Sequence, residues 1–418
     1  MTRTYVFALL CVGLSAVPAD AQMLTIAEAV DEAVRHNLSL IAQRANLTVA
    51  DTQMLTARLR PNPVASFSAD HLDLLGTGFD EANNGGPPEI AFRVDLPIER
   101  GAKRDRRVDL ASASKALAEA QFADAVRTLR ADVTLACIDV LAARATRALV
   151  ADNLRAFEDL ARVNRARVDA GSLAPVESTR SEIARLQFRS TAVRAELDLA
   201  TALARLRTLM GRTSAAPIDL SGDFGLTGVA PELAEVQHLA LVTRPDLRSL
   251  ELGQARSVAD LHLQEAIGRI DYTVGAEYRR QQGLSGRSNS LGFFVSAPLP
   301  VLSRNQGEIA RAGAEREQLL RQTAAVRAQV LSEVDIAYRE FTTNRDLVAA
   351  IERDLIQPAT SARDISTYTY RAGGSSLLEL LDAQRAFNDT MQSLLDAQAG
   401  LKRAVAHLNA AVGIEVMR

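Results

Sequence analysis

Apolar residues recur every three or four positions between Leu24 and Arg60, in a series that includes Ile26, Val30, Val34, Leu38, Ile41 and Leu47. This spacing places the side chains on one face of a helix, so it predicts a helix over 24–60. The motif Pro61-Asn62-Pro63 ends that helix, because a residue before proline avoids helical backbone angles. A corresponding helix is predicted over 231–267 in the second half of the chain.

The hydrophobic period changes after each of these helices. Apolar residues then alternate with other residues along one segment, at Ile90, Phe92, Val94, Leu96 and Ile98. This alternation predicts a strand with one apolar face. Together with strand-like residues over 64–72 and a loop over 76–88, it predicts a hairpin. A second strand pair is predicted over 270–280 and 291–299, separated by a polar loop over 281–289.

Long helices are predicted after each strand pair. Neither glycine nor proline occurs between Gly101 and Gly171, so this segment can form one helix of about 100 Å. Two apolar stripes mark it, one at Val126, Leu129, Val133, Ala136 and Val140, the other at Leu135, Ile138 and Ala142. Two stripes indicate partners on both sides, as in a ring of helices. The remaining predicted helices cover 175–210, 306–370 with a bend at Pro358, and 377–411.

The same short turn motif separates the long helices in both halves. Its first copy runs from Ala170 to Glu177, and its second runs from Ala372 to Glu379. An offset of 202 positions relates Gly171 to Gly373, Ala184 to Ala386, Leu199 to Leu401, Leu206 to Leu408 and Gly211 to Gly413. This shared spacing indicates a duplicated unit with a helical hairpin in each copy. We expect Gly171, Gly373 and Gly374 to adopt left-handed backbone angles.

The duplication predicts how the chain is divided. Residues 1–21 form a secretory signal, with an apolar run after Arg3 and a cleavage site at Ala19-Asp20-Ala21. Residues 22–211 form the first repeat, 212–231 a linker and 232–418 the second repeat. Because the mature chain contains no apolar stretch of membrane-helix length, the exported protein is either soluble or crosses a membrane as strands.

Composition narrows the possible functions. The chain is 47% hydrophobic but 4% aromatic and lacks tryptophan, which is typical of long helices in contact. A net charge of -3, with acidic and basic residues mixed, does not favour nucleic acid. After signal cleavage Cys137 is the remaining cysteine, so no intramolecular disulfide can form. The five histidines, His36, His71, His238, His262 and His407, show no metal-binding spacing. We therefore expect no enzyme activity, cofactor or bound metal.

The second turn carries a more specific signal. The stretch from Tyr370 to Gln384 is similar to the Y-x-x-G and D-x-L-D-A-Q motifs of the TolC family of outer-membrane efflux proteins. The resemblance covers essentially the whole mature chain. It implies a mainly α fold with membrane β, in which a duplicated long α-hairpin unit assembles as a homotrimer. A 12-stranded outer-membrane β-barrel would continue into a periplasmic α-helical barrel. A soluble sandwich is the alternative for the strands.

The resemblance also implies where the channel is gated. The glycine turns would lie at the periplasmic mouth, lined by Glu379 and Asp382 of the second turn and Glu177 of the first. Acids at these helix starts are also favoured by the helix dipole, without any gate. Family members can pair such acids with an arginine on a neighbouring helix. Here the position after the glycines is Ser375, and Arg371 is offset from it.

Other residues near these elements allow two interpretations each. Leu173, Val176, Leu377 and Leu378 are apolar residues near the tips of the hairpins. They either contact an adaptor protein or pack between helices of the same tunnel. The basic run Lys103-Arg104-Asp105-Arg106-Arg107 either faces lipid headgroups or forms a solvated helix start.

These observations predict an outer-membrane exit duct of a tripartite efflux pump, extending into the periplasm of a Gram-negative cell. It would passively export small solutes or metal cations, with a periplasmic adaptor (membrane fusion) protein and an inner-membrane pump as partners. Size and a start without a lipidation motif resemble the heavy-metal cation branch. Drug efflux and type I protein secretion are alternatives within this class. A non-channel periplasmic coiled-coil adaptor is a further alternative, which the two hairpins and two strand pairs argue against.

Overall fold

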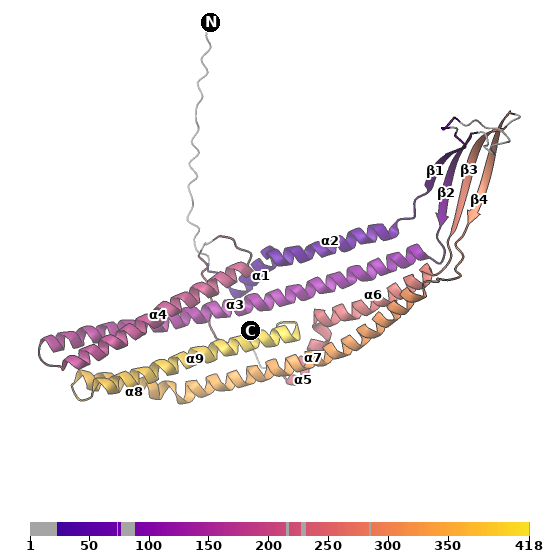
Figure 1. Ribbon diagram of the computed structural model, residues 1–418. Helices are drawn as coiled ribbons and strands as arrows, with labels where there is room; N and C mark the ends of the chain where they lie inside the picture. The colour runs from indigo at the N-terminus through magenta and orange to yellow at the C-terminus, as the bar shows by residue number, and fades with distance from the viewer. Residues whose placement is uncertain are drawn as a thin grey trace, which may run out of the picture. The chain divides into compact units, whose positions relative to one another are not determined.

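The computed structural model describes residues 23–72, 74–76, 88–214, 217–226, 231–283 and 286–417 (Figure 1). The predicted signal over 1–21 and most of the predicted loop over 76–88 lie outside these residues. The elements are α1 (Ile26–His36), α2 (Leu38–Arg58), β1 (Val64–Asp70), β2 (Glu89–Ile98), α3 (Lys103–Asp169), α4 (Pro175–Leu209), α5 (Leu233–Thr243), α6 (Pro245–Ile267), β3 (Tyr272–Gly283), β4 (Gly286–Ser296), α7 (Gln306–Asp354), α8 (Ile356–Arg371) and α9 (Leu377–Val412).

The described residues form two compact units. The turn unit comprises residues 23–37, Asp132–Leu226 and Asn344–Arg403, and it contains both glycine turns. The sheet unit comprises Leu38–Ala131, residues 231–343 and residues 404–417, and it contains all four strands. The helices α3, α7 and α9 each contribute residues to both units. None of the helices in the described ranges combines the length and apolar character needed to cross a membrane.

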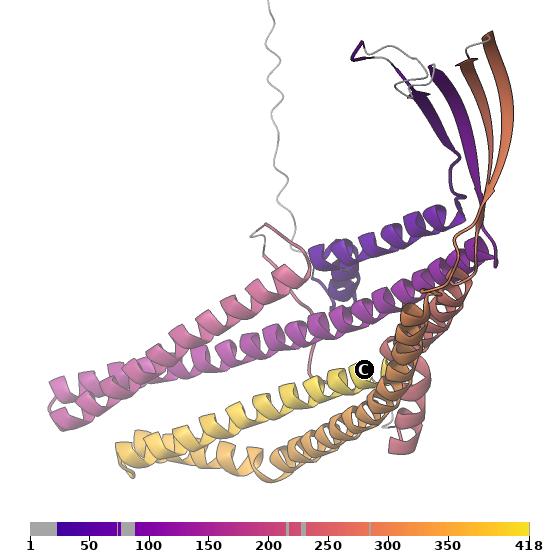
Figure 2. The same cartoon turned by 45° about the vertical axis from the view of Figure 1, so that its right-hand side comes forward.

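The four strands of the sheet unit form one antiparallel sheet in the order β1-β2-β3-β4 (Figures 1 and 2). Their register places the predicted apolar residues in shared rows, such as Phe67, Phe92, Tyr278 and Leu291. Because side chains alternate between faces, these rows form one apolar face. Among the described residues nothing covers that face, with Phe67 68% exposed and Phe293 79% exposed.

The prediction of a polar loop over 281–289 is wrong. β3 continues to Gly283 and β4 begins at Gly286, so that Gln281 pairs with Ser288 as a strand residue. The run of polar side chains indicated a loop, but ladder hydrogen bonds use the backbone of any residue with a free N–H.

The predicted end of β4 is also wrong. The strand ends at Ser296, so the predicted residues 297–299 lie beyond the sheet. Pro298 and Pro300 follow closely, and neither has an N–H to donate to a ladder.

Two helices predicted as continuous are each broken once. The breaks fall at Asn37 and Arg244, where ψ is 121° and 122°, so that both residues are extended. Pro245 explains the second break, because a residue before proline avoids helical angles. Both side chains bind helix-end carbonyls, which lack intrahelical partners. Asn37 donates to the Leu209 carbonyl at 2.8 Å, and Arg244 donates to the Ala411 carbonyl at 3.1 Å.

The bend predicted at Pro358 is present as a break between α7 and α8. The break residue is Leu355, and α7 ends at Asp354. A proline ring collides with the carbonyl four residues before it, which here belongs to Asp354.

The described part of the predicted linker that precedes residue 227 belongs to the turn unit and is packed within it. Leu24 and Leu220 form a parallel bridge, in which the Leu24 N–H donates to the Asp219 carbonyl at 2.8 Å. The Ser221 N–H donates back to the Leu24 carbonyl at 2.9 Å. Leu220 is 1% exposed, and Arg144 of α3 pairs with Asp219 at 3.0 Å. The start of the first repeat is therefore held by the segment that follows it.

The basic run at the start of α3 is divided: Asp105 and Arg106 are exposed, whereas Lys103 and Arg104 make contacts within the sheet unit. Lys103 is buried, and its Nζ donates to the Arg269 carbonyl at 2.8 Å. Arg104 donates to the Arg58 carbonyl, the last of α2, at 2.8 Å. These side chains hold helix ends beside the sheet.

Candidate functional site at the glycine turns

Both turns reverse the chain by the same backbone arrangement. The φ angles are +72° at Gly171 and +80° at Gly373, in the left-handed region that glycine adopts without strain. In each turn, the N–H after this glycine donates at 2.8 Å to the carbonyl five residues earlier. The glycine N–H donates to the carbonyl three residues earlier. This pair of bonds is a Schellman closure, which satisfies carbonyls at a helix end.

The left-handed angle predicted for Gly374 is wrong. Gly374 has no positive φ, because the Schellman closure requires one left-handed residue and Gly373 supplies it. A Cβ added to Gly374 would lie 3.7 Å from the nearest atom, the Thr369 carbonyl oxygen, which is an ordinary contact. The geometry therefore requires glycine at 171 and 373 but not at 374.

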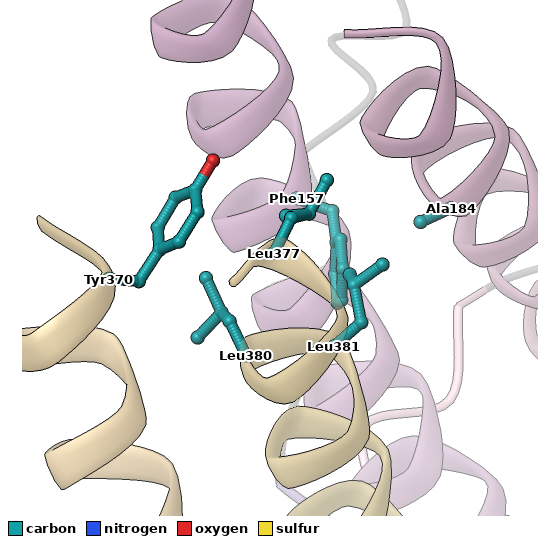
Figure 3. Close-up of a cluster of buried hydrophobic side chains, with 6 residues drawn as sticks. All are labelled: Phe157, Ala184, Tyr370, Leu377, Leu380 and Leu381. Carbon is teal, nitrogen blue, oxygen red and sulfur yellow. The ribbon is translucent and has the colours of Figure 1, made fainter. Parts of the chain in front are cut away.

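A buried apolar cluster joins the two hairpins behind the turns (Figure 3). It contains Phe157 of α3, Ala184 of α4, Tyr370 of α8, and Leu377, Leu380 and Leu381 of α9. Every member is at most 7% exposed. The Phe157 ring also stacks on Phe188 of α4, with 4.3 Å between ring centroids. Because all four helices contribute, separating the hairpins would expose this apolar surface to water, which is unfavourable.

A polar contact runs through the same cluster. The Tyr370 hydroxyl donates to Asn164 Oδ1 of α3 at 2.8 Å, and both residues are buried. Arg167 lies over the Tyr370 ring, with its Cζ 5.9 Å from the centroid. Burial raises the pKa of the Tyr370 hydroxyl, and the hydrogen bond to Asn164 opposes part of this rise. The phenol is therefore a protonated donor at neutral pH.

The sequence interpretation missed Asn164. A usable signal exists, because Phe157, Ala161 and Asn164 follow helical spacing and all are buried. An asparagine that continues an apolar stripe requires a hydrogen-bond partner, and Tyr370 provides it.

The two predicted gate acids of the second turn lie on the exposed side of α9. Glu379 and Asp382 are three residues apart, so they share one helix face, while Leu380 and Leu381 point into the cluster. The Glu379 N–H donates to Ser376 Oγ at 3.3 Å, which caps the helix. Asp382 pairs with Arg385 of the same helix at 3.8 Å. Its ion pair is therefore within α9 and not with a neighbouring helix.

The acid of the first turn has a different environment. Glu177 is half-buried in the first turn of α4, and its Oε1 accepts from Arg180 at 3.3 Å. Its Oε2 is buried and has no hydrogen-bond partner among the described residues. Across the part of the chain that is described, no group of three or more metal-ligating side chains is positioned to hold a metal ion.

The four apolar residues predicted near the tips divide into two kinds. Leu377 is 2% exposed and packs in the cluster, and Leu173 is half-buried. Val176 and Leu378 are 52% and 55% exposed, so they are available to another surface.

The chain belongs to the outer membrane efflux protein family, whose model matches residues 29–212 and 236–414. It is 26% identical to the cobalt-zinc-cadmium resistance protein CzcC of Cupriavidus metallidurans, over 87% of this chain and 83% of the relative. It is also 26% identical to the nickel and cobalt resistance protein CnrC of that organism, over 65% and 62% of the two chains.

Among solved structures, the fold is similar to CusC, a protein studied for its folding and transmembrane channel formation. The TM-score is 0.75 at 17% identity, covering 93% of this chain and 92% of that one. The predicted family and fold class are confirmed, and with them an outer-membrane location and a role in efflux.

Proposed function

We propose that three copies of the chain form the passive exit duct of a tripartite pump that exports metal cations. The observation that carries this proposal is the sheet, which has one uncovered apolar face and one charged face. Lipid would cover the apolar face. Among the described residues, the outer edges of β1 and β4 pair with no further strand, and a neighbouring copy would satisfy their backbone groups. Three copies would supply twelve strands.

The duplicated hairpins would form the periplasmic tunnel of this duct. The proposed repeats are 22–211 and 232–418, joined by 212–231. Their turns would lie at the mouth that receives solute from an adaptor protein and an inner-membrane pump. The duct itself would perform no enzymatic step, because the pump supplies the energy. Relatives named for cobalt, zinc, cadmium and nickel resistance support metal cations as the solute.

The mouth would open and close by separation of the hairpins. The buried cluster and the Tyr370–Asn164 hydrogen bond favour the closed arrangement. Glu177, Glu379 and Asp382 would line the mouth and attract cations. Adaptor contacts at exposed residues such as Val176 and Leu378 would favour the open state.

Cell fractionation and metal resistance test the duct. We expect the protein in the outer membrane as a heat-resistant trimer, and we expect its deletion to sensitise cells to cobalt, zinc or cadmium. Recovery as a soluble periplasmic protein would refute the duct. Unchanged metal resistance with lost drug resistance or protein secretion would assign another branch of the same class.

Charge removal at the mouth tests the gate residues. The combined Glu379→Gln and Asp382→Asn variant should change single-channel conductance and reduce block by added divalent cations. Asp389→Asn is the control for charge loss away from the turn, because it removes one exposed charge, against two in the double variant, two turns further along α9. If both variants behave alike, the acids near the turn have no special role in gating.

A further inference from the structure

The face of the sheet opposite the apolar one carries a network of ion pairs. Arg93 pairs with Asp95 at 2.9 Å. Arg279 pairs with Glu89 at 2.6 Å and with Glu277 at 2.9 Å. All five residues share one face, because each occupies an alternate position of β2 or β3 and Arg93 stands directly opposite Glu277. The network therefore spans the two central strands.

Two glycines, which lack a Cβ, leave space on the sheet surface for the side chains of this network. A Cβ on Gly275, which stands opposite Asp95, would overlap the Asp95 carboxylate. A Cβ on Gly292 would lie 3.1 Å from the Phe294 ring, which in turn has Arg93 over it at 4.3 Å from the centroid. The charged and aromatic side chains therefore lie along the sheet surface. Glu277 is 9% exposed even within the single chain.

The charges on this face do not balance. Arg279 is one guanidinium shared by two carboxylates, while Arg93 is matched by Asp95 alone. Asp70 of β1 stands in the same row as Glu89, is exposed, and adds a further carboxylate. The described strand residues thus place four carboxylates and two guanidiniums on this face. Two negative charges per chain are left uncompensated.

We infer that this face is a charge filter that favours cations over anions, and that Glu277 and Arg279 set its strength. The inference rests on the proposed function, because the face lines a conduit only when copies of the chain close the sheet. Rings of acidic side chains favour cations in channels. The filter would act independently of the helical gate, since its residues belong to the sheet unit and the gate residues belong to the turn unit.

The test is the reversal potential of the purified trimer in a planar bilayer under a potassium chloride gradient. Glu277→Gln removes one negative charge per chain and should lower the cation-to-anion permeability ratio by at least about twofold. Arg279→Gln should raise that ratio. The double variant Glu277→Gln/Arg279→Gln restores the net charge and should return the ratio to the wild-type value. Asp70→Asn, which breaks no ion pair among the described residues, should lower the ratio without disturbing the network.

Arg280→Gln is the matched control. Arg280 follows Arg279 but points to the apolar face, opposite Ile90. It carries the same charge change, and we expect no shift in reversal potential. If the wild type conducts ions but none of Glu277→Gln, Arg279→Gln and Asp70→Asn changes the cation-to-anion permeability ratio, the filter is refuted and the proposed duct stands. Equal shifts for Arg279→Gln and Arg280→Gln also overturn it. A trimer that conducts no ions, both as wild type and with Tyr370→Phe to weaken the closed state, overturns the proposed duct, and the filter with it.

Discussion

The two glycine turns share a backbone but differ in how the following helix is held. In the second turn, Ser376 caps α9 and Leu377 is 2% exposed. In the first turn, Ala174 at the position of Ser376 offers no side-chain cap, and Pro175 at the position of Leu377 is exposed. An identical Schellman closure can therefore precede an anchored helix start or a loosely held one. The turn fixes the reversal of the chain, whereas the flanking residues decide how firmly the hairpin is attached to its neighbour.

The largest expected difference between the turns comes from truncating the first apolar side chain of each following helix, Leu377 in α9 and Val176 in α4. Leu377→Ala leaves a cavity in the buried cluster and should destabilise the first turns of α9 by about 2–5 kcal/mol. Val176→Ala removes an exposed side chain and should change stability by less than about 0.5 kcal/mol. Hydrogen exchange of α4 and α9 amides measures both values. Equal losses of protection would show that the two helix starts are held alike.

A smaller effect is expected from the hydroxyl that links the hairpins. Tyr370→Phe keeps the ring but leaves Asn164 Oδ1 buried without its donor, at a cost of about 1–3 kcal/mol. The closed state should weaken, and the open fraction in single-channel recordings should rise. Tyr368→Phe is the control, because Tyr368 is 75% exposed on the same helix. If both variants raise the open fraction equally, the hydrogen bond has no specific role in gating.

The glycines themselves should give equal effects in the two turns. A Cβ at Gly171 or Gly373 meets nothing within 4 Å, so Gly→Ala introduces backbone strain alone, about 1–2 kcal/mol at each site. Gly374→Ala is the control and should be near neutral, because its φ is not positive. Denaturation of each purified variant measures these differences. A larger loss at Gly374 than at Gly373 would contradict the assignment of the left-handed residue.

The smallest expected effect concerns the helix caps. Ser376→Ala should cost about 1 kcal/mol by removing the hydrogen bond to the Glu379 N–H. The reciprocal change Ala174→Ser should stabilise the start of α4 by a comparable or smaller amount, because that position has no side-chain cap. Local hydrogen exchange would reveal both. If Ala174→Ser has no effect, the looseness of the first turn does not arise from its missing cap.

Much of the fold follows from local periodicity. Alternation in β2 and β3 predicts the sheet with its apolar face, and the absence of glycine and proline predicts α3. Helix breaks were harder to predict, although Pro245 signals one of them. Asn37 gives a weaker signal, because its extended conformation is stabilised by Leu209, which lies far away in the sequence. The start of β4 was missed because polar residues on both faces of a strand resemble a loop.

The candidate site was predictable only in part. The turn motif locates both reversals, and helical spacing places Glu379 and Asp382 on one face. The Tyr370–Asn164 contact joins residues 206 positions apart on different helices. No local pattern in either helix specifies that pairing. The ion-pair network of the sheet depends in the same way on the register between β2 and β3.

The bridge between Leu24 and Leu220 has a consequence for biogenesis. A chain emerges from the ribosome, or crosses a membrane, with its N-terminal end first. Leu24 therefore cannot form its bridge with Leu220 until residues 219–221 have also emerged. The N-terminal segment of the first repeat can form these hydrogen bonds only after the whole of that repeat has emerged. A chain arrested before this point would carry an unclosed N-terminal segment, exposed to proteases and to pairing with another copy.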